Sequence, residues 1–93
     1  MAYFALKFEY GGMNSVPFTE NFDVYLKAIG STIRKLRKEL KLSQEELAHR
    51  SSIDRSHMGK IERGERNVSI ANVIRISRAL QCSPSELLHR AGM

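Results

Sequence analysis

The residues most able to do chemistry lie between Ser43 and Gly64, in the segment SQEELAHRSSIDRSHMGKIERG. The segment is long enough for two short helices with a tight break between them. An alanine lies within the first helix, and the second helix carries long polar side chains. This layout is that of a helix-turn-helix, which presents a short helix to the major groove of DNA. The chemistry expected of it is hydrogen bonding to phosphates and base edges.

No pattern typical of catalysis or metal binding accompanies this segment. Ser56 and His57 follow Asp54 closely, but adjacent residues on a helix point apart and do not build a catalytic triad. The histidines and the single cysteine, Cys82, lack the spacing of a zinc site. No glycine-rich phosphate loop ending in Lys-Ser or Lys-Thr is present. We therefore expect no enzyme, no metal ion, no cofactor and no small-molecule ligand.

Length and charge limit the protein class further. The chain has 93 residues and a formal net charge of +5. It is long enough for one domain with a modest core, but not for a deep enzyme pocket. The positive surplus favours a polyanionic partner, although it also serves solubility. One cysteine excludes an intrachain disulfide and fits the cytoplasm, and the chain shows neither a membrane-spanning apolar run nor a signal peptide.

The spacing of apolar residues predicts helices from residue 23 onwards. The first helix is expected over 23–40, where Ile29, Ile33, Leu36 and Leu40 form one apolar stripe. Caps predict the other four. These are a helix over 44–51 after Ser43, one over about 54–63 begun by Asp54 and ended by Gly64, one over 70–80 after Ser69, and a short one after Ser83-Pro84. For the helix over 70–80 we expect an inner face of Ile70, Val73, Ile74, Ser77 and Leu80.

Residues 1–22 form a separate N-terminal extension to the domain over 23–93. The sequence AYFALKFEY alternates with period two and ends at Gly11-Gly12, which predicts a strand. A single strand is not stable alone. It either pairs with the same strand of a second subunit or is disordered, and Met13 is an alternative start of the protein.

Four stretches together resemble a known family. S-Q-E-E-L-A, I-D-R-S, K-I-E-R-G-E-R-N and S-P-S-E-L-L are similar to the lambda-repressor/Cro (Xre-type) DNA-binding domain over roughly residues 29–91. The segment IDRSHMGKIERGERNVS is especially similar to the controller proteins of restriction–modification systems. The resemblance implies an all-α, compact five-helix lambda-repressor-like domain, with the motif over 44–63 and the recognition helix over about 54–63.

The resemblance also assigns DNA contacts. Arg55 is expected to bind guanine O6 and N7 through two hydrogen bonds. Ser56, His57 and Lys60 share the outward side of the recognition helix, although a surface histidine needs no role. Gln44 is expected to contact a phosphate at the start of its helix. Arg66 and Asn67 follow the recognition helix as further phosphate contacts, and Arg37 and Glu62 are expected to form a partly buried ion pair.

The sequence departs from this family at several glycine positions. Lys41, Ser52 and Gln81 stand where the family favours glycine. If the backbone is left-handed there, each costs roughly 1 kcal/mol relative to glycine, and otherwise the turns relax. Conversely, Gly59 lies inside the recognition helix, either to let DNA approach closely or because little packs there.

The function expected is that of a homodimeric, sequence-specific regulator of transcription on a pseudo-palindromic double-stranded operator. Its half-sites should lie about 34 Å apart, or a multiple of that. The predicted dimer surface is Ile76, Ala79, Leu87 and Leu88, with the N-terminal strand as the alternative contact. Two other functions stay open. One is an antitoxin that also binds a toxin, and the other is a protein-interaction module without DNA. Polymerase is a further candidate partner.

Overall fold

The computed structural model describes residue 16 and residues 18–93. The strand predicted within residues 2–10 and the alternative start at Met13 lie outside these residues. The described part folds into five helices: α2 (Phe22–Glu39), α3 (Gln44–Ser51), α4 (Arg55–Glu62), α5 (Ile70–Ala79) and α6 (Pro84–Arg90). Within it all regular structure is helical, which confirms the all-α class. None of these helices is both long and apolar enough to cross a membrane.

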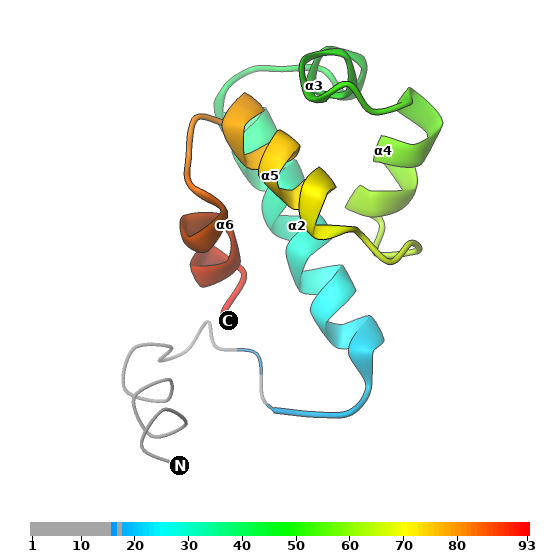
Figure 1. Ribbon diagram of the computed structural model, residues 1–93, viewed down its shortest axis with the longest axis vertical. Helices are drawn as coiled ribbons and strands as arrows, with labels where there is room; N and C mark the ends of the chain where they lie inside the picture. Colours follow the sequence, from blue (N-terminus) through cyan, green and yellow to red (C-terminus); the bar gives the residue numbers. More distant parts are fainter. Residues whose placement is uncertain (1–15, 17) are drawn as a thin grey trace.

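The longest helix, α2, runs through the molecule, and the four shorter helices gather around its C-terminal half (Figure 1). On one side α4 packs against α2, and on the other side α6 does. The helix α3 contacts both α4 and α5, and α5 also contacts α6. Before α2, Val16 lies next to the C-terminus, where its N–H donates a hydrogen bond to the Gly92 carbonyl at 3.1 Å.

Side-chain caps determine where the short helices begin. The Ser43 hydroxyl accepts a hydrogen bond from the Glu46 N–H at 3.0 Å, and the Ser43 N–H donates to Glu46 Oε1 at 2.8 Å. This reciprocal capping box satisfies two backbone donors at the start of α3. Ser69 and Ser83 cap α5 and α6 with a single bond each, in which the serine hydroxyl accepts from a backbone N–H three residues on.

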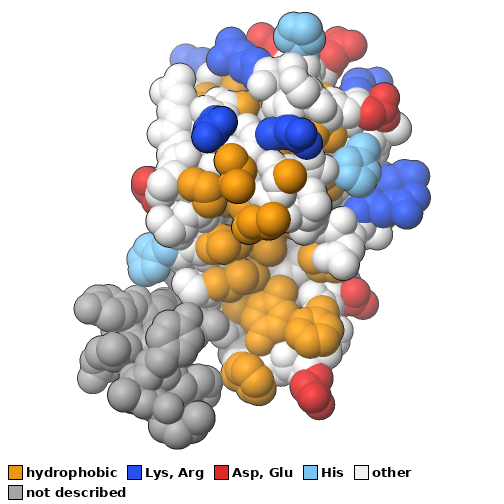
Figure 2. Space-filling model, in the orientation of Figure 1, with side chains coloured by type: hydrophobic (Ala, Val, Ile, Leu, Met, Phe, Trp, Pro, Cys, Tyr) orange, Lys and Arg blue, Asp and Glu red, His pale blue; other side chains and the backbone are white. Residues whose placement is uncertain are grey.

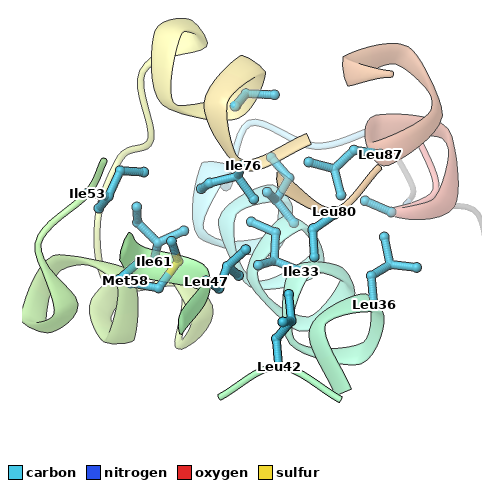
Figure 3. Packing of buried hydrophobic residues seen from close by; sticks show 14 residues of the cluster. Ile33, Leu36, Leu42, Leu47, Ile53, Met58, Ile61, Ile76, Leu80 and Leu87 are labelled. Carbon is cyan, nitrogen blue, oxygen red and sulfur yellow. The ribbon is translucent and has the colours of Figure 1, made fainter. Parts of the chain in front are cut away.

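The core lies where α2, α3, α4, α5 and α6 meet, and Figure 3 shows side chains from these helices pointing toward one another. The structure corrects the predicted inner face of α5. Ile70 is 68% exposed, whereas Ile76 is fully buried. The buried residues Val73, Ile76, Ser77 and Leu80 are spaced i, i+3, i+4, i+7, whereas Ile70 is the first residue of α5, at the end of the helix before this stripe.

Two residues of the predicted dimer surface are also corrected by this packing. Ile76 and Leu87 are both 0% exposed within a single chain, so neither is available to a second copy. Leu87 is buried because α6 packs against both α2 and α5. Leu40 was predicted to belong to the apolar stripe of the first helix, but it is exposed just after the end of α2. Leu42 is buried instead.

A glycine that the sequence analysis did not single out sets the distance between α2 and α4. A Cβ built on Gly30 would lie 2.3 Å from the Ile61 carbonyl oxygen and 2.6 Å from that of Glu62. Both oxygens are backbone atoms of α4, so they cannot move aside cheaply. The absence of a side chain at Gly30 therefore allows α2 to approach the backbone of α4 directly.

All five helices end in the same left-handed turn. After α3, the Ser52 N–H donates to the His49 carbonyl and the Ile53 N–H donates to the Ala48 carbonyl. This is the Schellman pattern of hydrogen bonds, and it recurs after the other four helices. Only α4 and α6 place glycine at the left-handed position, with Gly64 and Gly92. Lys41, Ser52 and Gln81 are left-handed at φ 59°, 55° and 64°, so these turns have not relaxed.

The left-handed residues predict a gain in stability from glycine. Gln81 is exposed, and we expect Gln81→Gly to raise the free energy of unfolding by about 1 kcal/mol, because glycine adopts this conformation without the Cβ penalty. In a domain of this size that corresponds to roughly 4–8 °C in Tm, measured by thermal denaturation. Gln81→Ala is the control, since alanine keeps the Cβ. Equal Tm values for the two variants would contradict the explanation.

Candidate nucleic-acid interface

The helix α4, which the sequence predicts to be the recognition helix, starts from a carboxylate cap. Asp54 Oδ2 accepts hydrogen bonds from the Ser56 N–H at 3.0 Å, from the His57 N–H at 3.4 Å and from the Ser56 hydroxyl. These bonds, the one from the Ser56 hydroxyl above all, lower the pKa of the Asp54 carboxyl. Because the pKa of Asp54 is lower in the folded state than in the unfolded state, its cap stabilises the fold above the unfolded-state pKa. This stabilisation is lost as the pH falls through the folded-state pKa.

An open groove runs along the exposed side of α4 and reaches the start of α3. Its lining consists of polar side chains around one glycine: Gln44, Asp54, Arg55, Ser56, Gly59, Lys60 and Arg63. Three of these side chains carry a positive charge and one a negative charge, so the groove is net basic. On the face shown in Figure 2, the Lys and Arg side chains gather over the half of the molecule that holds α3, α4 and α5.

The groove brings together four of the residues predicted to contact DNA: Gln44, Arg55, Ser56 and Lys60. His57 is half-buried and is not part of its lining. Arg66 and Asn67 are exposed in the connection between α4 and α5, outside the groove. Arg63 lines the groove but was not predicted to. The only sequence feature that could have identified Arg63 is its position within the stretch K-I-E-R-G-E-R-N, which carries part of the family resemblance.

Gly59 has a structural role that neither sequence-based explanation described. It is buried, and a Cβ added there would lie 3.2 Å from Gln44 Oε1 and 3.2 Å from Arg63 Nη1. The suggestion that little packs at this position is therefore wrong. The bare backbone of α4 at Gly59 makes room for the amide of Gln44 and the guanidinium of Arg63.

A buried carboxylate lies behind the groove and joins three helices. Glu62 accepts hydrogen bonds from Arg37 Nε at 2.8 Å, from Arg37 Nη2 at 3.1 Å and from Gln44 Nε2 at 3.2 Å. The Arg37 and Glu62 side chains are only 11% and 2% exposed. Arg37 Nη1 also donates to the Leu42 carbonyl at 2.9 Å. The expected ion pair is thus present, and its carboxylate also orients Gln44.

This network explains how Gln44 is presented. One end of its amide is held by Glu62 of α4, and its Oε1 lies against Gly59. Gln44 is also the first residue of α3, where the backbone N–H groups and the helix dipole favour an anion. The arrangement can therefore hold a phosphate at the start of α3 next to the exposed side of α4.

The family to which the chain belongs follows from a comparison with known proteins. The helix-turn-helix family HTH_3 matches residues 33–87, which include every residue of the groove. The chain belongs to this family. The family resemblance read from the sequence is therefore confirmed. HTH_3 is a class of DNA-binding helix-turn-helix regulators and not a class of enzymes.

Several members of HTH_3 are similar to the chain over most of their length. Control protein C.SmaI from Serratia marcescens is 38% identical over 65 residues, which cover 70% of this chain and 77% of that protein. Control protein C.MunI from a Mycoplasma species is 46% identical over 59 residues, covering 62% of this chain and 80% of that protein.

The fold also matches a solved structure of this family. The crystal structure of the restriction-modification controller protein C.AhdI from Aeromonas hydrophila is 47% identical, with a TM-score of 0.65. The match covers 67% of this chain and 94% of that chain.

The buried ion pair yields a stability prediction. We expect Arg37→Leu to lower the free energy of unfolding by about 3–5 kcal/mol, because it leaves the Glu62 carboxylate buried without its main partner. The measurement is equilibrium unfolding in urea. The control is the double variant Arg37→Leu with Glu62→Leu, which removes the stranded charge and should recover part of the loss. A loss below about 1 kcal/mol in the single variant would show that the pair is not needed.

Proposed function

We propose that the chain is a sequence-specific transcriptional regulator that binds a pseudo-palindromic operator as a homodimer, with α4 of each copy in a major groove. The observation that carries the proposal is the net basic groove, where Gln44, Arg55, Ser56 and Lys60 share one exposed surface around α4. A major groove of B-DNA accommodates one helix, and an exposed arginine on that helix can reach a base edge.

The groove suggests a different role for each side chain. Arg55 follows the cap directly and is exposed, so its guanidinium is the group assigned to a guanine edge. Lys60 and Ser56 lie on the same surface and serve a base or a phosphate. Gln44, Arg66 and Asn67 are assigned to phosphates, which set the register of the protein on DNA without reading the sequence. His57 is assigned a phosphate contact at the margin.

The dimer surface is proposed anew after the correction of Ile76 and Leu87. Ala79 of α5 and Leu88 of α6 are half-buried and remain as candidates. They belong to helices that pack against each other, away from the residues of the groove. Figure 2 shows a band of hydrophobic side chains that extends over this face of the molecule toward the start of α2. Half-sites about 34 Å apart, or a multiple of that, follow from a two-fold dimer.

The relatives support a controller role. Their names describe control proteins and a restriction-modification controller protein, which makes regulation of such an operon, in the cytoplasm, the first candidate for this chain. The similarity to these relatives extends over most of their length, at 77%, 80% and 94% of each relative. An antitoxin that also binds a toxin, or a regulator that contacts polymerase, would use a protein surface in addition to the groove.

The proposal predicts a loss of selectivity in Arg55→Ala. We expect the wild-type protein to bind DNA from upstream of its own gene, with an affinity that falls steeply as salt rises. Arg55→Ala should reduce the difference in binding free energy between operator and non-operator DNA by about 1–3 kcal/mol, since one bidentate base contact is lost. Electrophoretic mobility shift titrations with both DNAs measure this difference.

The control for this experiment is Arg90→Ala, which removes the same charge from α6, outside the groove. It should leave the selectivity unchanged. Failure of the wild-type protein to bind any upstream fragment at low salt would refute the function itself. Undiminished selectivity in Arg55→Ala would refute only the assignment of the base contact.

A further inference from the structure

Arg63 is the cation of the groove to which neither the sequence pattern nor the family resemblance assigned a role. It is the C-cap residue of α4, and it makes a two-point ion pair with Glu65. Arg63 Nε donates to Glu65 Oε2 at 2.9 Å, and Nη2 donates to Oε1 at 3.3 Å. Both side chains are more than half exposed, at 57% and 53%. A pair this exposed contributes little to the stability of the fold, so its geometry calls for another explanation.

The pair leaves one edge of the guanidinium facing the groove. Glu65 occupies the Nε side, while Nη1 lies 3.2 Å from the position that a Cβ on Gly59 would take. Gln44 Oε1 lies at the same distance from that position. Nη1 and Gln44 Oε1 therefore both lie beside the bare backbone of α4 at Gly59. Among the described residues, no hydrogen-bond acceptor is assigned to it.

Three positive charges surround the Glu65 carboxylate. The hydrogen bond from Arg63 lowers its pKa most, and the charges of Lys60 and Arg66 lower it further. These positive groups favour the ionised carboxylate. It can hold the guanidinium by its Nε side while the Nη1 edge binds a second acceptor.

We propose that Arg63 is a further DNA-contacting residue, that its Nη1 edge binds a backbone phosphate, and that Glu65 positions it over Gly59 for this purpose. A phosphate is the partner that fits the end of α4, because the start of the helix carries Arg55, the side chain assigned to base edges. The phosphate would lie next to the one held by Gln44, whose amide shares the space over Gly59. This inference rests on the proposed DNA-binding function.

The first test replaces the arginine. Arg63→Ala should weaken binding to operator and non-operator DNA by a similar factor, on the order of fivefold, and should reduce the slope of log affinity against log salt by about one. Fluorescence anisotropy titrations over a salt series measure both quantities. An unchanged slope would overturn the contact. A loss limited to one operator sequence would show a base contact instead and would overturn the assignment to phosphate.

The second test separates the position of Arg63 from the charge of Glu65. Glu65→Asp keeps the negative charge but shortens the side chain by one methylene, so it should disturb only the two-point pair. We expect it to weaken DNA binding about threefold when Arg63 is present, and to have no effect in the Arg63→Ala background. Glu86→Asp on α6 is the matched control, because Glu86 makes a similar pair with Arg90, whose side chains are about half exposed. Glu86→Asp should leave the affinity for DNA unchanged.

The outcomes distinguish this inference from the proposed function. If Glu65→Asp binds DNA as well as or better than the wild type, then Glu65 does not position Arg63. If its effect is the same with and without Arg63, the two residues act independently, and the inference again fails. Selective binding by the wild-type protein in either case would leave the proposed function standing. The absence of any binding by the wild-type protein would remove both.

Discussion

The buried carboxylate of Glu62 is the group on which the rest of the structure depends. A buried charge is costly unless its hydrogen bonds are satisfied, and here Arg37 of α2 and Gln44 of α3 supply three N–H groups. The requirement to satisfy this carboxylate fixes α4 against α2 and orients the first side chain of α3. The core and the groove are therefore coupled, because the same carboxylate stabilises the packing and positions a residue assigned to DNA.

Backbone close approach is the second constraint. Gly30 lets α2 touch the carbonyl groups of α4, and Gly59 leaves space on the other side of α4 for Gln44 and Arg63. A side chain is excluded at Gly30 by the backbone of α4, and one at Gly59 would press on the ends of Gln44 and Arg63. After three of the helices, by contrast, a residue with a side chain stands where glycine would fit better. Lys41, Ser52 and Gln81 adopt a left-handed conformation there that glycine would adopt without strain. The fold tolerates this cost because each turn still satisfies the last carbonyls of its helix.

Caps and apolar periodicity made most of the fold predictable. Ser43, Asp54, Ser69 and Ser83 placed the helix starts within one residue, because each cap has a local hydrogen-bonding reason. On the inner face of α5, Val73, Ser77 and Leu80 are buried as predicted, but the prediction was wrong for Ile70, which is exposed, and it left out Ile76, because only tertiary packing decides between these two isoleucines. Gly30 and the Arg63–Glu65 pair could not be predicted, because their roles depend on atoms from other segments or on side-chain geometry.

The most direct test of the claim that α4 and the start of α3 form the DNA-binding surface is a titration of the isotope-labelled protein with upstream DNA, followed by NMR. We expect the largest chemical-shift changes at the side-chain amide of Gln44 and at the backbone amides of Ser56, Gly59 and Lys60, with α6 little affected. Shifts concentrated in α6 or at the start of α2, with the groove residues unchanged, would contradict the account.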